Sequence, residues 1–231
     1  MKLSKRNIKE EKTSEKLKVY IHILVMGDPS TGKSSLIKFY KDNRFFEKEN
    51  LFNMGPVIKD VDTPKGKVTL FINEYDGTIR PINESVLMLF DHFPSYRELF
   101  LKYSGKIDYI ILLFDSTKRS TFEGIKEYLE FIKQRRKQPL KVYLLGTKYD
   151  KYNEVQINNE EAETFSNQNN IEFKPVTCRI GFGYDNNIKQ IFNEIANHYI
   201  DSEAFEEQIN KQKNKLKLSA QQASKKKCVI Y

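Results

Sequence analysis

The feature that most constrains this chain is a glycine-containing loop between a strand-like segment and a helix-like segment. Residues 19–26 are rich in β-branched and aromatic side chains and predict a buried strand. Residues 27–34 follow with GDPSTGKS, which fits G-x-x-x-x-G-K-[ST], and a helix is expected from Gly32. Such a loop can turn its backbone N–H groups toward phosphate oxygens, and the helix start adds positive potential. The sequence therefore predicts a phosphate-binding loop.

The residue types in this loop indicate separate roles. The Lys33 ammonium would reach the β and γ phosphates and supply the main catalytic charge, and the Ser34 hydroxyl would bind Mg²⁺. The other loop positions are expected to contact the phosphates; they are Asp28, Pro29, Ser30, Thr31, Gly32 and Ser35.

The rest of the chain favours an α/β fold. Apolar runs at 109–114 and 142–145 each lead into a polar loop and a helical pattern, as a parallel sheet with crossover helices requires. Apolar side chains from Ile188 to Tyr199 recur at helical spacing and predict the last helix of the domain. Residues 68–75 and 86–90 are interpreted as a hairpin that turns at Asp76 and Gly77.

Charge and composition suggest one domain with two basic tails. Residues 1–18 carry seven basic and three acidic groups, and residues 211–231 carry seven lysines and no acid. We expect a basic extension at 1–18, a globular domain at 19–200 and a flexible tail at 201–231. Because the globular part is nearly neutral, no nucleic-acid partner is expected. Two cysteines and no long apolar run predict an intracellular protein without a membrane span.

A second motif predicts which base is bound. Residues 144–150 read LLGTKYD and end an apolar run with T-K-x-D, a variant of the N-K-x-D guanine motif. The Asp150 carboxylate can accept hydrogen bonds from the ring N–H and the exocyclic amine of guanine, and adenine offers no such pair. Thr147, Lys148 and Asp150 are therefore candidate base-binding residues.

With these two motifs in this order, the chain resembles the Ras superfamily of small GTPases, most closely its Rab and Rho-like branches, over about residues 19–200. The resemblance implies a P-loop NTPase G domain with a six-stranded, mostly parallel sheet, helices on both faces and one antiparallel hairpin. It implies that Phe45 contacts the base, although core packing is an equal alternative. It also implies that the backbone of Thr177, Cys178 and Arg179 reads the guanine carbonyl.

The switch motif of the family has two possible registers here. In the first, residues 87–94 (LMLFDHFP) replace the D-T-A-G motif, so that Asp91 would hold Mg²⁺ through water. In the second, residues 74–77 (EYDG) form the motif, with Glu in place of Asp. The first is preferred because Asp76 and Gly77 also fit a hairpin turn. Spacing offers Asn53 or Thr63 as the switch threonine, and Thr63 is taken as a further metal ligand.

Under either register the family's water-orienting glutamine is missing, because Thr78 or Ser95 follows the motif. The resemblance therefore implies slow hydrolysis of GTP. Residues 225–231 read KKKCVIY and resemble a C-a-a-X prenylation signal, although Tyr231 is an unusual last residue. Lipidation of Cys228 and the neighbouring lysines would hold the protein on the cytoplasmic face of a membrane.

The leading hypothesis is a membrane-attached switch that cycles between GTP and GDP with Mg²⁺ in trafficking or signalling. Effectors, exchange factors and activating proteins would be its partners. The alternative is a pseudo-GTPase scaffold that binds guanine nucleotide without hydrolysing it. A P-loop kinase or ATPase is a third possibility, which Asp150 disfavours.

Overall fold

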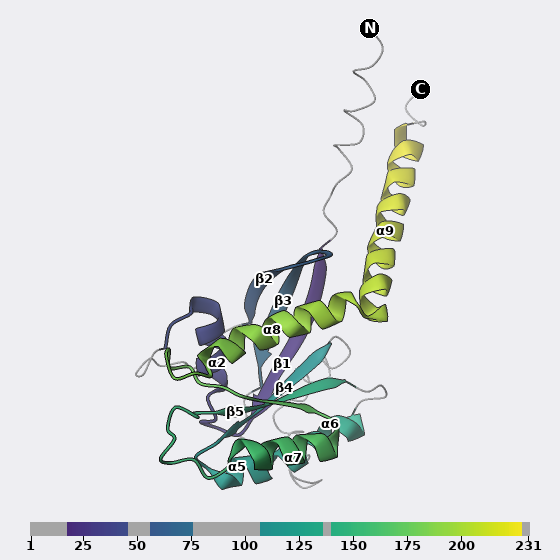
Figure 1. Ribbon diagram of the computed structural model, residues 1–231. Helices are drawn as coiled ribbons and strands as arrows, with labels where there is room; N and C mark the ends of the chain where they lie inside the picture. The colour runs from purple at the N-terminus through teal and green to yellow at the C-terminus, as the bar shows by residue number, and fades with distance from the viewer. Residues whose placement is uncertain (1–17, 46–55, 76–106, 136–139, 228–231) are drawn as a thin grey trace, which may run out of the picture.

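The computed structural model describes residues 18–45, 56–75, 107–135 and 140–227 (Figure 1). Six strands form one sheet in the order β2-β3-β1-β4-β5-β6. All neighbouring pairs are parallel except β2 and β3, which are antiparallel. The strands are β1 (Val19–Gly27), β2 (Val57–Thr63), β3 (Gly66–Glu74), β4 (Tyr109–Asp115), β5 (Lys141–Thr147) and β6 (Glu172–Pro175). The predicted α/β class and mostly parallel sheet are confirmed.

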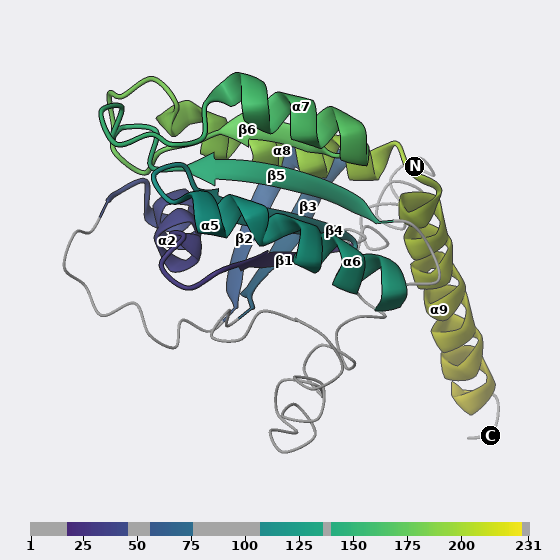
Figure 2. The ribbon, with the colours of Figure 1, turned by 90° about the horizontal axis from the view of Figure 1, so that it is seen from below.

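Helices cover both faces of this sheet (Figures 1 and 2). One face packs against α2 (Lys33–Asp42) and α8 (Asp185–Ile200), and the other against α5 (Arg119–Glu123), α6 (Ile125–Arg135) and α7 (Asn159–Asn169).

The alternation of side chains along β1 explains why the sheet has two cores. Ile21, Ile23 and Val25 belong to the hydrophobic cluster that contains α2 and α8. Leu24 and Met26 belong to the cluster on the other face. Successive strand side chains point to opposite faces, so a strand buried on both sides is apolar at every position. No helix within the described ranges is long and apolar enough to cross a membrane.

An antiparallel hairpin is present, as expected, but it is formed by β2 and β3. The antiparallel partner of β3 is β2, with Thr63 paired to Gly66 across the turn. The opposite edge of β3 pairs with β1 from Val68 to Glu74. Because a strand has only two edges, both edges of β3 are occupied from Val68 to Ile72. Residues 76–77 and 86–90, on which the expected turn and second strand fall, lie outside the described residues.

The tail after Ile200 contains a helix that the sequence analysis did not predict, and its expected flexibility stays a prediction. Residues Glu203–Lys227 form a 25-residue helix, α9, that projects from the domain (Figure 1). Lysine, glutamine, glutamate and alanine are good helix formers, and three glutamates lie near the positive N-terminal end of the helix. Phe205 is buried and Ile209 packs against the α2/α8 core, which anchors the helix base.

Candidate functional site

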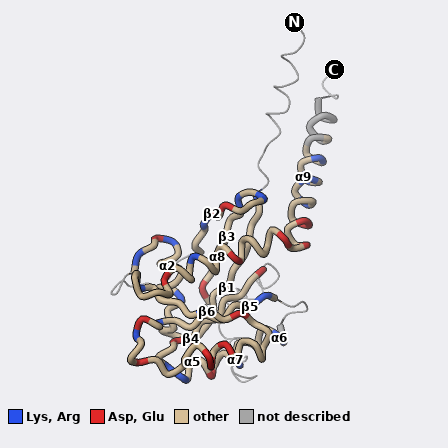
Figure 3. Tube along the Cα trace, in the orientation of Figure 1, with Lys and Arg blue, Asp and Glu red and all other residues tan. Residues whose placement is uncertain are grey.

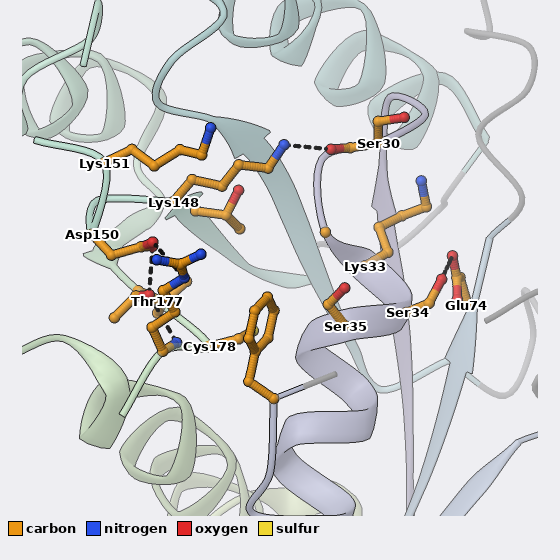
Figure 4. A pocket seen from close by; sticks show the side chains of 15 residues that line it. Ser30, Lys33, Ser34, Ser35, Glu74, Lys148, Asp150, Lys151, Thr177 and Cys178 are labelled. Atoms are coloured by element: carbon orange, nitrogen blue, oxygen red, sulfur yellow. Dashed lines mark hydrogen bonds and ion pairs between the residues drawn. The ribbon is translucent and has the colours of Figure 1, made fainter. Parts of the chain in front are cut away.

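A pocket of about 360 Å³ opens where the carboxyl ends of β1, β3 and β5 meet the start of α2 (Figure 4). The crossover arrangement brings these chain segments together, although they are far apart in sequence. Twelve predicted site residues line it: Ser30, Gly32, Lys33, Ser34, Ser35, Phe45, Thr147, Lys148, Asp150, Thr177, Cys178 and Arg179. Glu74, Lys151 and Val176 also line it.

The loop between β1 and α2 has a backbone shape that needs glycine. Gly27 has φ +146°, and a Cβ there would lie 2.4 Å from the carbonyl oxygen of Leu113. Gly32 has φ +95° and Ser30 has φ 63°. Positive φ is strained for residues with a Cβ and unstrained for glycine. The local sequence thus produces the expected tight turn into α2.

Lys33 lies inside this loop and is buried. Its Nζ donates hydrogen bonds to the carbonyl oxygens of Gly27 at 3.0 Å and Asp28 at 2.9 Å. The ammonium is thereby held at the amino end of α2, where the helix dipole is positive. An anion at this point would meet a fixed positive charge and the backbone N–H groups of the first helical turn.

Asp28 and Thr31 take part in hydrogen bonds that stabilise the loop. Both are buried, and Thr31 Oγ1 donates to the carbonyl of Asp28 at 2.8 Å. Tyr128 of α6 donates to Asp28 Oδ1 at 3.2 Å. Asp28, Thr31 and the exposed Pro29 are not among the pocket-lining residues, so their predicted contact with the nucleotide stays a prediction.

The carboxylate beside Ser34 belongs to Glu74. Ser34 Oγ donates to Glu74 Oε1 at 2.9 Å, and Glu74 ends β3 next to Val25 of β1. The structure therefore favours the second register of the switch motif, the one that the sequence analysis did not prefer. Asp91 lies outside the described residues, so its predicted role in metal binding stays a prediction.

Thr63 lies at the far end of the same hairpin. It pairs with Gly66 at the start of β3, whereas Glu74 ends that strand. At the rise of a β-strand the two ends are separated by about 26 Å. The prediction that Thr63 shares a metal ion with Ser34 is therefore wrong. Spacing in the sequence could not reveal this separation, because the hairpin reverses the direction of the chain between Thr63 and Glu74.

Thr147 and Lys148 hold the phosphate loop against the ends of the neighbouring strands. Thr147 Oγ1 lies 2.7 Å from the carbonyl oxygen of Thr31. Lys148 Nζ donates to the Ser30 carbonyl at 2.9 Å and to Asp115 Oδ2 at 2.6 Å. Burial alone would raise the pKa of Asp115, but hydrogen bonds from Lys148 and Thr117 outweigh it and hold that pKa below its ordinary value.

Asp150 forms the opposite end of the pocket. Its side chain is 8% exposed, and its Oδ1 accepts a hydrogen bond from Thr177 Oγ1 at 2.6 Å. Arg179 Nε lies 3.5 Å from Oδ2, and the Arg179 guanidinium lies 5.8 Å from the centre of the Phe45 ring. Phe45 is 38% exposed, so the alternative that it only packs in the core is wrong.

Cys178 lies beside Asp150 in the pocket wall. Burial raises the pKa of its thiol to about 12, and the nearby Asp150 charge adds to the shift. The thiol is therefore protonated at neutral pH and suits packing against a planar ring better than nucleophilic chemistry.

The pocket thus has an anion-binding end at Lys33, a hydroxyl–carboxylate pair at Ser34 and Glu74, and a carboxylate at Asp150. This donor set fits a nucleotide lying across the sheet edge with a divalent cation at its phosphates. Sequence reasoning missed Lys151 and Val176, which belong to no motif. It weighed Glu74 but ranked it second.

Comparison with known proteins gives one family match and several relatives. The Ras family model matches residues 91–201, downstream of the phosphate loop and of Glu74. "Ras-like protein rasU" of Dictyostelium discoideum is 26% identical over 205 residues, covering 83% of this chain and 81% of the relative. "Ras-related protein RabZ" of the same organism is 25% identical over 83% of this chain and 79% of its own length. "Ras-related protein Rab-26" of Bos taurus is 23% identical over 183 residues, covering 78% of this chain and 66% of the relative.

Proposed function

We propose that this chain, a small GTPase of the Ras superfamily by its family match and its relatives, is a membrane-attached switch that cycles between GTP and GDP. One observation carries the proposal. A single pocket joins the phosphate loop at Lys33 and Ser34 to the carboxylate of Asp150. Phosphate binding and guanine recognition require those two ends in one cavity.

Lys33 would neutralise the β and γ phosphates. In the structure its Nζ is held by two loop carbonyls, so the charge is already at the amino end of α2. Thr147 and Lys148 brace the loop from the other side, which limits its reorganisation on binding.

Asp150 would select guanine by accepting from its ring N–H and exocyclic amine. Thr177 already occupies Oδ1 at 2.6 Å and fixes the orientation of the carboxylate. Phe45 and the stem of Lys148 offer the surfaces between which a planar base would lie. Adenine lacks this pair of donors, so it would form neither of the two hydrogen bonds that guanine can give to Asp150.

Ser34 and Glu74 are the described side chains that would hold Mg²⁺. A hydroxyl and a carboxylate oxygen are hard ligands, and both face the phosphate end of the pocket. The ion would neutralise charge on the transferred phosphoryl group. Hydrolysis would be slow, because Thr78 stands after the motif where the family has a glutamine.

The same features support a second candidate, a pseudo-GTPase scaffold. Glutamate replaces aspartate at position 74, and no glutamine follows the motif, so turnover could be lost while guanine binding remains. In either case effectors, exchange factors and activating proteins are the expected partners. Prenylation of Cys228 next to three lysines would place the protein on the cytoplasmic face of a membrane.

The test is nucleotide analysis of the purified full chain, followed by single-turnover GTP hydrolysis with Mg²⁺. Bound guanine nucleotide with slow turnover supports the switch, and GTP that is never hydrolysed supports the scaffold. Absence of guanine nucleotide, with no GDP affinity, would overturn both.

Asp150→Asn tests base recognition directly. It should weaken GDP binding at least about a hundredfold and improve binding of xanthosine diphosphate, whose C2 carbonyl accepts where guanine donates. Asp62→Asn, an exposed substitution of the same kind on β2, should change neither affinity.

A further inference from the structure

The first residues of β1 continue their hydrogen-bond ladder onto a helix. On the β4 side of β1, the carbonyl of His22 accepts from the Asp108 backbone N–H at 2.9 Å. Lys18 and Tyr20 have the same parity as His22, so their peptide groups point to that side too. Among the described residues, β4 begins pairing only at Ile23 and does not reach them.

Two glutamines of α9 take the place of the missing strand. Gln208 Oε1 accepts from the Tyr20 N–H at 2.8 Å, and its Nε2 donates to the Tyr20 carbonyl at 3.0 Å. Gln212 makes the same pair of bonds to the N–H and carbonyl of Lys18. A carboxamide has the donor and acceptor of a peptide group, so each glutamine replaces one peptide unit of a strand.

The spacing explains why a helix can do this. Four residues along a helix rise about 6.0 Å, and two residues along a strand advance about 6.6 Å. Gln208 and Gln212 therefore meet Tyr20 and Lys18 in register. Gln208 Nε2 also lies 3.2 Å from the Tyr199 hydroxyl, which fixes the orientation of the amide.

The base of α9 is held by further contacts. Phe205 is buried. Lys65, in the turn of the β2–β3 hairpin, donates to the Ile200 carbonyl at 2.9 Å and pairs with Asp201 at 2.9 Å. The chain around the α8–α9 junction is thus tied to the sheet on two sides, by the hairpin turn and by β1.

Beyond Gln212 the helix projects from the domain and is basic (Figures 1 and 3). Residues 213–231 contain six lysines and no acid. Leu216 is 40% and Leu218 is 59% exposed in this part. Lys18, the first described residue, is hydrogen-bonded to Gln212, so the chain enters β1 beside the base of α9.

We propose that Gln208 and Gln212 lock α9 as a rigid arm, and that this arm meets an anionic lipid bilayer. The charge of the arm complements such a surface, and its exposed leucines can enter the interface. The arm leaves the amino end of β1, about 26 Å from the phosphate loop at its carboxyl end. The lock therefore holds the nucleotide pocket facing away from the bilayer at a set orientation. This deepens the membrane attachment proposed above and does not depend on lipidation of Cys228.

The lock is tested in solution by electron spin resonance distance measurement. Spin labels are placed at Lys67→Cys and Lys217→Cys in a full chain that carries Cys228→Ser. The parent should give one narrow distance distribution, and Gln208→Leu with Gln212→Leu should broaden it at least twofold. The control, Asn210→Leu with Asn214→Leu, also replaces two carboxamides by leucine, at exposed positions of α9, and its distance distribution should stay narrow. A broad parent distribution, or a narrow one in the lock variant, would overturn the lock.

Gln212→Leu alone provides a second variant that removes only the outer pair of bonds. It should increase amide exchange at Lys18 at least tenfold while GDP affinity, measured in parallel, stays at the parent value. Unchanged exchange at Lys18 would also contradict the lock.

The bilayer is tested with unlipidated full chain and vesicles of phosphatidylcholine with or without 30% phosphatidylserine. Binding should require phosphatidylserine and fall at high salt. Replacing Lys213, Lys215 and Lys217 with Gln should weaken it at least tenfold, and the lock variant should bind as the parent does. Binding to neutral vesicles, or no loss in the triple variant, would overturn the bilayer as the partner. Neither result would affect guanine binding, so the two proposals can fail separately.

Discussion

Ser34 Oγ donates a hydrogen bond to Glu74 Oε1 at 2.9 Å, and this contact joins the first turn of α2 to the last residue of β3. The two residues are 40 positions apart in the sequence, and Glu74 lies on the strand next to β1, the strand that leads through the phosphate loop into α2. The contact identifies the described carboxylate that stands at the phosphate end of the pocket. The metal-binding hypothesis therefore depends on Glu74.

Glu74→Gln keeps the size of the side chain and removes its charge. We expect Mg²⁺ to bind more weakly, so GDP release in the presence of Mg²⁺ should accelerate at least about tenfold, equivalent to about 1.4 kcal/mol. Chelation should then accelerate release further by much less than in the parent. Stopped-flow measurement with a fluorescent GDP analogue reads both rates, and the exposed Glu130→Gln is the matched control. If the Glu74→Gln variant released GDP at the same rates as the parent, Glu74 would be excluded as a metal ligand and Asp91 would be the remaining candidate.

Lys148→Met should make the protein more sensitive to acid. The hydrogen bonds from Lys148 and Thr117 keep the pKa of buried Asp115 below its ordinary value of 3.8, so their stabilisation is present above that pH and is lost as pH falls through the lower native pKa. Removing the ammonium leaves a carboxylate that is 1% exposed without its cation. We expect about 3 kcal/mol of destabilisation at pH 7 and an acid-unfolding midpoint at higher pH.

Urea unfolding at pH 7 and a circular dichroism titration from pH 7 to 2 measure these two effects. Lys151→Met removes a neighbouring lysine whose partner is the exposed Glu154, and it should cost less than about 1 kcal/mol. Equal losses in the two variants would contradict the structural role of the Lys148–Asp115 pair.

Gly27→Ala should be strongly destabilising. Its Cβ would lie 2.4 Å from the backbone oxygen of Leu113, which cannot move without disturbing β4, and φ is +146°. Gly66→Ala has φ +126° but nothing within 4 Å of its Cβ, so it isolates the strain of positive φ. In chemical unfolding, we expect the free energy of unfolding to fall by roughly 1 kcal/mol for Gly66→Ala and by at least about 3 kcal/mol for Gly27→Ala. A smaller fall for Gly27→Ala than for Gly66→Ala would contradict the predicted clash with Leu113.

Cys178 should resist alkylation in the native protein. Burial raises the pKa of its thiol to about 12, so very little thiolate is present at pH 8. Iodoacetamide followed by peptide mass spectrometry should show modification at least a hundredfold slower in the folded chain than in urea. Comparable rates would contradict the raised pKa of this thiol.

The sequence reveals much of the site because its key motifs are local. The segment from Gly27 to Ser34 carries its own turn geometry, and the apolar residues before it specify the strand that positions it. Asp150 could be predicted in the same way, since it lies three residues after the end of β5. The structure brings both motifs into one pocket, as the spacing suggests.

Other features depend on contacts that no local pattern encodes. Thr63 was chosen by spacing, but strand pairing places it at the far end of the hairpin from Glu74. The tail after Ile200 reads as polar sequence, yet Gln208 and Gln212 find backbone partners 188 and 194 residues away. A glutamine in isolation does not indicate which peptide group it will meet.

The sequence by itself determined the fold class, the phosphate loop and the residues at the base end of the pocket, because these follow from hydrophobic periodicity and from short motifs. Only the tertiary structure decided that Glu74 stands beside Ser34 and that α9 is fastened to β1. The physical reason is that strand order and register bring distant residues together, and that a helix is stabilised by the surface it packs on rather than by composition alone.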